Sequence, residues 1–170
     1  MGTPRKQRRK FERPTHPWRM DRITEEKELC TRFGLKNRKE IWKAKSRLAR
    51  IREQARKLLA REGPDADKQT KELVAKINTW GMKAGNLDDI LALNIDMLLE
   101  RRLQTVLFRK GLAATPMQAR QLIAHNHVYV KNHRVNVPGY IVLADEEITV
   151  RVADDIKVEK RAGKEEEATA

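Results

Sequence analysis

Arginine and lysine side chains dominate the stretch from residue 98 to residue 140, and their types and spacing are suited to binding anions. Between Arg101 and Ala144 the sequence contains seven arginines or lysines and three histidines, but no aspartate or glutamate. Phosphate oxygens are attracted by such cations and repelled by carboxylates, so this composition favours contact with a nucleic-acid backbone. The seven cations are Arg101, Arg102, Arg109, Lys110, Arg120, Lys131 and Arg134.

Two predicted helices position most of these side chains. The first runs from Leu99 to Gly111 around an apolar stripe, and Arg102, Thr105 and Arg109 are spaced to project away from that stripe. The second begins with an N-cap threonine, a proline and a capping-box glutamine, and one arginine on it is expected to face outward. These residues are Thr115, Pro116, Gln118 and Arg120. The helix is expected to end near His125 and to bury Ala119, Leu122 and Ile123.

A strand-rich segment follows the second helix. Valines alternate with polar residues on either side of a turn at residues 131–133, which predicts a hairpin with Lys131 and Asn132 at its tip. Two more strands are expected around an acidic turn at residues 145–147. Both helices and the hairpin tip are expected to line one concave face. The predicted strands are 128–130, 135–137, 141–143 and 148–152.

The net charge of +13 is concentrated at the N-terminal end of the chain. Residues 1–61 contain 21 basic and 7 acidic side chains, whereas residues 62–170 contain 16 basic and 17 acidic ones. The segment from Met1 to Pro17 has almost no apolar residues to bury, so we expect it to stay disordered until it meets a partner. Its basic residues Arg5, Lys6, Arg8, Arg9, Lys10 and Arg13 are candidate RNA contacts.

Helices are predicted for most of residues 18–99. One helix is expected to end at Gly34, and the next is expected to begin at Asn37 with Glu40 completing a capping box. The second of these helices has an apolar face and an opposite cationic face, and two further helices are predicted at 65–80 and 87–99. Three tryptophans are expected to pack in the core. The apolar face comprises Ile41, Leu48, Ile51, Ala55 and Leu58, the cationic face includes Lys39, Lys43, Arg47, Arg50 and Arg61, and the tryptophans are Trp18, Trp42 and Trp80.

The sequence argues against several other classes of protein. No apolar run is long enough to span a membrane and no signal-peptide pattern is present, so the cytosol is the expected location. Cys30 is the single cysteine, and the histidines near residue 127 lack further metal ligands, so no metal site is expected. Asp88 and Asp89 open a predicted helix, where negative charge is favourable, which explains them without acid–base chemistry. Phosphate-binding loops and nucleophile elbows are also missing, so no enzymatic activity and no cofactor are expected.

Residues 98–150 closely resemble the S-four RNA-binding module, which is named after a protein of the small ribosomal subunit. The resemblance rests on RRLQTVLFRKGLA, TPMQARQLIAHNHVYVKNHRVNVPGY and DEEITV. The preceding LLERRL and the N-terminal MGTPRKQRRKFERPTHPW resemble the ribosomal protein family itself, in its archaeal branch. The resemblance implies an α+β fold: a basic extended arm (1–17), a helical domain (18–98), an S-four domain of two helices on a small, mainly antiparallel sheet (99–152) and a polar, acidic tail (153–170).

The resemblance also implies a structural role in the small ribosomal subunit. A member of this family binds the five-prime domain of small-subunit ribosomal RNA early in assembly, near the channel through which messenger RNA enters and beside neighbouring ribosomal proteins. RNA contacts are then expected from the arm, from Lys43, Arg47 and Arg50, and from Arg101, Arg102, Thr105, Arg109, Thr115, Arg120, His125, Lys131, Asn132 and Arg134.

Two other functions remain open at this point. An RNA-modifying enzyme or a tyrosyl-tRNA synthetase can carry the same module, although it needs a catalytic domain that this length does not accommodate. A stand-alone factor that acts on stalled ribosomal particles can carry it too, without the long basic N-terminal helices.

Overall fold

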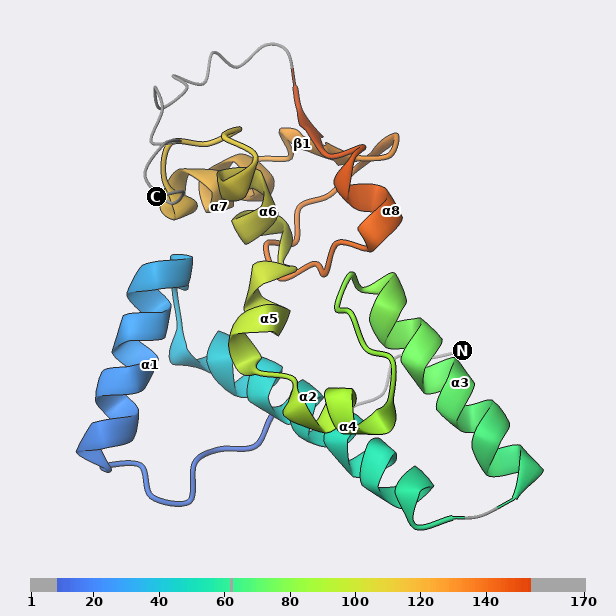
Figure 1. Cartoon of the computed structure of the whole chain (residues 1–170). Coiled ribbons are helices and arrows are strands. Elements are labelled where there is room, and N and C mark those ends of the chain that lie inside the picture. The colour runs from blue at the N-terminus through green and yellow to red at the C-terminus, as the bar shows by residue number, and fades with distance from the viewer. Residues whose placement is uncertain (1–8, 62, 154–170) are drawn as a thin grey trace, which may run out of the picture. The chain divides into compact units, whose positions relative to one another are not determined.

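The computed structural model describes residues 9–61 and 63–153. The chain divides into two compact units: unit 1 comprises Met1–Ile77 and Lys83–Leu98, and unit 2 comprises Asn78–Met82 and Leu99–Ala170. Unit 1 is helical, whereas unit 2 combines helices with a small sheet (Figure 1). This mixture confirms the predicted α+β class.

In unit 1, α1 and α4 both pack against α2. Gly34 adopts a left-handed conformation with φ 60° and ends α1, as the sequence predicts. The predicted apolar face of α2 is buried along its whole length, which confirms the helical periodicity. The helices are α1 (Met20–Phe33), α2 (Arg38–Leu59), α3 (Pro64–Thr79), α4 (Leu87–Ala92) and α5 (Ile95–Glu100), and both α3 and α5 cross the boundary of the two units.

Two local predictions for unit 1 are wrong. The single helix predicted at 87–99 is interrupted at Leu93, whose backbone is not helical (φ −54°, ψ 130°) and whose carbonyl accepts a 2.5 Å hydrogen bond from Nη2 of Arg52. Asn37 occupies the N-cap of α2, but its side chain makes no capping hydrogen bond. The start of α4 is as expected, because Asp89 Oδ2 accepts the backbone N–H groups of Gly85 and Asn86 at 2.8 and 3.1 Å.

A buried carboxylate joins α1 to α2. Glu26 is fully buried, and its Oε1 accepts hydrogen bonds from Nη1 of Arg22 at 2.9 Å and from Nε1 of Trp42 at 3.0 Å. Nζ of Lys45 lies 3.8 Å from the same oxygen. The expectation of core packing is wrong for Trp18, which is 86% exposed.

The described part of the N-terminal arm contacts this cluster. The ring of Phe11 lies 6.0 Å from the ring of Trp42, and the backbone N–H of Glu12 donates to Oγ of Ser46 at 2.9 Å. Arg22 Nη2 also donates to the carbonyl of Pro17 at 2.6 Å. Part of the segment that the sequence predicts to be disordered without a partner therefore contacts unit 1 through residues 11, 12 and 17, and residues 1–8 lie outside the described residues.

In unit 2, α6 packs against α7, and a three-stranded antiparallel sheet completes the fold in the order β2-β1-β3. Aliphatic residues from both helices and from β1 form its core, and Val142 and Val150 join them from farther along the chain. The elements are α6 (Leu103–Arg109), α7 (Pro116–Ala124), β1 (Val128–Val130), β2 (His133–Arg134), α8 (Ala144–Glu147) and β3 (Arg151–Val152).

Four predictions for unit 2 need correction. The first helix begins only at Leu103, because Arg102 pairs with Ile141 in an isolated antiparallel bridge. This bridge replaces the strand predicted at 141–143, and the acidic turn predicted at 145–147 is the short helix α8. The strands β2 and β3 are shorter than predicted and lie at 133–134 and 151–152.

Candidate nucleic-acid interface

Cations between residues 101 and 110 lie close to a carboxylate group in the folded chain. Nη1 of Arg101 lies 2.6 Å from Oε2 of Glu147, and Nη2 of Arg109 lies 2.5 Å from Oε1 of the same carboxylate. Nζ of Lys110 donates to the backbone carbonyl of Glu147. The stretch without acidic residues in the sequence therefore lies beside a carboxylate of α8 in the structure. This carboxylate partly neutralises the charges of Arg101 and Arg109.

Arg101 and Arg102 are structural parts of unit 2 rather than exposed helix residues. Each is only 8% exposed, and Arg101 also donates to the carbonyl of Val142 at 3.0 Å. The hydroxyl of Thr105 donates to the carbonyl of Leu99 at 2.9 Å. The prediction that Arg102 and Thr105 project from one exposed helix face is wrong, because the chain enters α6 only after Arg102.

The start of α7 follows the prediction closely. Oγ1 of Thr115 accepts the N–H of Gln118 at 3.1 Å, and Oε1 of Gln118 accepts the N–H of Ala114 at 2.7 Å. Buried Gln104 on α6 donates to the carbonyl of Pro116 at 2.9 Å, which joins the two helices. Arg120 is half-buried with Nη1 3.4 Å from Oε1 of Gln104, so this glutamine also orients an arginine of the predicted face.

The hairpin tip is exposed and is held by a second carboxylate. Lys131 has φ 55° in the turn after β1, and its Nζ lies 3.1 Å from Oε1 of Glu146. The hydroxyl of Tyr140 donates to Oε2 of Glu146 at 2.8 Å. Asn132 at the tip is exposed, as is His125 at the end of α7.

Glu146 and Glu147 of α8 both have a pKa below the ordinary value of a glutamate. Desolvation raises the pKa of Glu147, but hydrogen bonds and charge from Arg101 and Arg109 outweigh it, so the net shift of this pKa is downward. Desolvation likewise raises the pKa of Glu146, and hydrogen bonds from Tyr140 and Lys131 lower it further than burial raises it. The two carboxylates are therefore charged at neutral pH and keep the neighbouring cations in place.

Unit 1 presents a separate cationic surface on α2. Lys43, Arg47 and Arg50 are exposed there, in agreement with the predicted solvent face. Arg9, Lys10 and Arg13 of the arm are also exposed, whereas Arg5, Lys6 and Arg8 lie outside the described residues.

Sequence reasoning missed the carboxylates and the aromatic ring that contact the predicted cations. Glu146 and Glu147 were assigned to a surface turn, because nothing in their spacing shows that the chain folds them back onto α6 and the hairpin tip. Tyr129 contacts Arg134 through a 2.8 Å hydrogen bond from Nε to the phenolic oxygen. Its position between two buried valines was a usable signal, because alternation places it on the other face of β1.

The described residues contain no cluster of histidine, cysteine, aspartate or glutamate that could hold a metal ion. The rings of His125 and His127 stack with their centroids 6.3 Å apart. In the same part of the chain, no helix combines the length and the apolar character that a membrane crossing requires.

Comparisons with known proteins agree with the architecture of unit 2. A family model for the S4 domain, the module of the sequence resemblance, matches residues 101–148. The chain is 45% identical over 150 residues to the small ribosomal subunit protein uS4 of Methanococcus aeolicus, over 86% of this chain and 85% of the relative. It is 49% identical over 150 residues to the protein of the same name from Saccharolobus islandicus, over 86% and 83% of the two chains.

Proposed function

The chain belongs to the uS4 family of small ribosomal subunit proteins, and from this membership we propose that it is an RNA-binding structural constituent of the small ribosomal subunit. The observation that carries the proposal is the similarity over 86% of the chain to archaeal relatives that bear this name. The relatives are named as ribosomal proteins and not as enzymes, which supports a structural role over the catalytic alternatives.

The finer role that we propose is early binding to the five-prime domain of small-subunit ribosomal RNA. From that place, in the cytoplasm, the protein lies beside neighbouring ribosomal proteins and near the channel through which messenger RNA enters, where it contributes to translational accuracy. Folded RNA junctions are recognised mainly through shape, phosphates and two-prime hydroxyls. Exposed arginine, lysine, threonine and asparagine side chains suit such recognition, and they support this proposal.

We divide the predicted RNA-binding residues into two groups by their burial and internal hydrogen bonds. Arg101, Arg102 and Thr105 are buried or bonded internally, so we assign them to positioning α6. The accessible remainder is the proposed contact surface, together with the predicted contacts in residues 1–8. It comprises Arg9, Lys10, Arg13, Lys43, Arg47, Arg50, Arg109, Thr115, Arg120, His125, Lys131, Asn132 and Arg134.

Salt-dependent binding to defined transcripts tests the proposal. A transcript of the five-prime domain of an archaeal small-subunit RNA is titrated at several salt concentrations, next to a three-prime-domain transcript of equal length. We expect tighter binding to the five-prime domain and a log–log salt slope of about −0.7 to −0.9 for each neutralised phosphate. Equal affinity for both transcripts, or affinity that does not change with salt, contradicts the proposal.

A matched pair of triple variants then locates the contacts in unit 1. Replacing Lys43, Arg47 and Arg50 with glutamine is expected to make the slope shallower by up to about three phosphate units. The control replaces Lys68, Lys71 and Lys83 with glutamine, which removes equal charge from exposed positions in the acid-rich part of the chain. A similar loss in both variants means that net charge, rather than the α2 surface, determines affinity.

A further inference from the structure

The outer face of the sheet carries an aromatic residue directly between two arginines. In the register of the sheet, Tyr129 of β1 is paired with Arg134 on β2 and with Arg151 on β3. Val128 and Val130, its neighbours on β1, are buried in the core. The three side chains therefore form one row across all three strands on the face opposite the core, in the order Arg134–Tyr129–Arg151. We name it the outer row.

Both arginines interact with the tyrosine ring. Cζ of Arg134 lies 5.5 Å from the ring centroid and Cζ of Arg151 lies 5.4 Å from it. Nε of Arg134 also donates to the phenolic oxygen, which fixes one guanidinium beside the ring. Both arginines are exposed and the tyrosine is half-buried, so planar groups and positive charge are accessible together.

The arginines of the outer row differ from the cations in and just before α6 and at the hairpin tip, because those cations are paired with carboxylates. Arg101, Arg109 and Lys131 each form an ion pair with a carboxylate of α8. Within the described part of the chain, no carboxylate forms an ion pair with Arg134 or Arg151. Phosphate groups can therefore approach these two guanidinium groups without displacing a carboxylate of the described residues.

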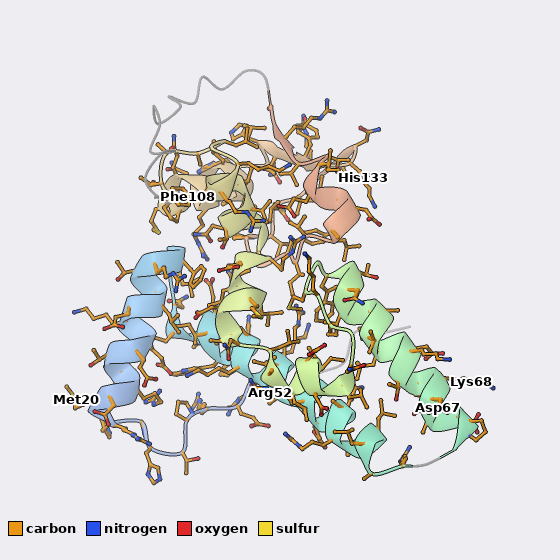
Figure 2. All side chains as sticks on the ribbon, viewed as in Figure 1. Met20, Arg52, Asp67, Lys68, Phe108 and His133 are labelled. Carbon is orange, nitrogen blue, oxygen red and sulfur yellow. The ribbon has the colours of Figure 1, made fainter. Side chains whose placement is uncertain are left out.

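We propose that the outer row is a second RNA contact, which binds an unpaired nucleotide by stacking its base on these planar groups and by pairing flanking phosphates with the two arginines. Aromatic rings flanked by cations bind single strands in this way, without reading their sequence. The inference deepens the proposed ribosomal role, because it assigns single-stranded RNA to a face outside the predicted helix surface. The outer row can be located in Figure 2 from the labelled His133, which precedes Arg134 in β2.

The first test uses RNA that does not depend on the ribosomal assignment. Oligouridine of about ten nucleotides, a length within the usual range for such surfaces, is bound to the full chain and crosslinked with ultraviolet light. Mass spectrometry is expected to place a crosslink at Tyr129. Tyr140, whose hydroxyl is bonded to Glu146, serves as the internal control and is expected to remain unmodified. Crosslinks that leave Tyr129 unmodified overturn the inference.

Paired variants provide the second test. Tyr129→Phe retains the ring and is expected to bind oligouridine within about threefold of the unaltered chain. Tyr129→Val retains strand propensity but removes the ring, and a stacking loss of one base corresponds to a weakening of about 5- to 150-fold. Replacing both Arg134 and Arg151 with glutamine is expected to reduce the salt slope by up to about two, whereas Lys68→Gln leaves it unchanged.

The outcomes separate this inference from the proposed ribosomal role. Equal oligouridine affinity for the phenylalanine and valine variants overturns the outer row as a stacking site, even if the five-prime-domain transcript binds normally. Oligouridine binding that requires Tyr129, combined with no preference for the five-prime-domain transcript, retains the outer row and overturns the ribosomal role. Circular dichroism and thermal melting of each variant identify any loss of fold. If Tyr129→Val does not fold, the position of the crosslink, the Tyr129→Phe variant and the arginine variants decide whether the outer row binds RNA.

Discussion

Arg101 and Glu147, which are 46 positions apart in the sequence, meet with 2.6 Å between Nη1 and Oε2. This pair joins the segment before α6 to the helix α8, and Arg109 binds the other oxygen of the same carboxylate. One glutamate therefore fixes two arginines that the sequence presents as free cations. A residue outside the predicted binding surface thus determines the geometry and net charge of part of that surface.

Glu147→Gln is expected to lower the free energy of unfolding by about 1–3 kcal/mol at neutral pH, because the buried arginine loses its charged acceptor. The pKa of Glu147 is lowered from its ordinary value of 4.5 in the folded state. Its stabilisation is therefore present above pH 4.5 and is lost as the pH falls through the folded-state pKa. Urea unfolding at several pH values measures both effects. Asp145→Asn, on the exposed side of the same helix, is the control, and an equal loss in both variants contradicts a specific role of Glu147.

Arg102→Gln is expected to destabilise unit 2 by about 1–3 kcal/mol, because it replaces an arginine residue that is only 8% exposed. Arg151→Gln removes the same charge from an exposed position of the same unit and is expected to stay within about 0.5 kcal/mol. Thermal melting compares the two. Equal melting temperatures mean that Arg102 is a surface residue, as the helical periodicity alone suggests.

Gly81→Ala is expected to disturb Arg101 directly. Gly81 has φ 77°, and a β-carbon built there lies 2.7 Å from Cζ of Arg101. Gly111 has a similar φ of 69° with no atom within 4 Å of its β-carbon position, so Gly111→Ala shares the backbone strain without the contact. Thermal unfolding should show a larger loss of stability for Gly81→Ala, and equal losses would show that the Arg101 side chain moves aside at no cost.

Two N-terminal truncations separate the charge of the arm from its packing. Removing residues 1–8 is expected to weaken RNA binding and leave the melting temperature unchanged. Removing residues 1–17 also deletes the ring contact between Phe11 and Trp42 and the hydrogen bond from Arg22 to the carbonyl of Pro17. The melting temperature is therefore expected to fall as well. Calorimetry together with RNA titration of both truncated chains measures the difference. Identical melting temperatures would show that the contacts of residues 11–17 contribute nothing to stability.

Periodicity and capping signals predicted those parts of the fold that local interactions determine. The buried face of α2 follows from the spacing of its apolar residues, and the start of α7 follows from Thr115 and Gln118. Gly34 ends α1 because a residue without a β-carbon adopts the left-handed conformation readily. In each of these places the cause and the structure lie within a few residues of one another.

The errors lie where distant residues decide the local structure. Pairing with Ile141 keeps Arg102 out of the helix that its sequence spacing predicts. Arg52 bonds the carbonyl of Leu93 where the predicted helix 87–99 is interrupted. Glu146 and Glu147 of α8 form ion pairs with cations that lie earlier in the chain. The stretch without acidic residues in the sequence therefore contains ion-paired cations in the structure. These contacts depend on tertiary structure, which a one-dimensional pattern does not encode.

The position of β1 in the centre of the sheet sets the order in which the S4 domain is completed during synthesis. One edge of β1 pairs with β2 across the adjacent turn, so this hairpin can close as soon as both strands exist. The other edge of β1 can pair only after Arg151 and Val152 have been synthesised, because these residues follow α8 in the chain. Local pairs form faster than distant ones. A nascent chain that stops before Glu147 therefore leaves one edge of β1 open and the guanidinium groups of Arg101 and Arg109 without the Glu147 carboxylate.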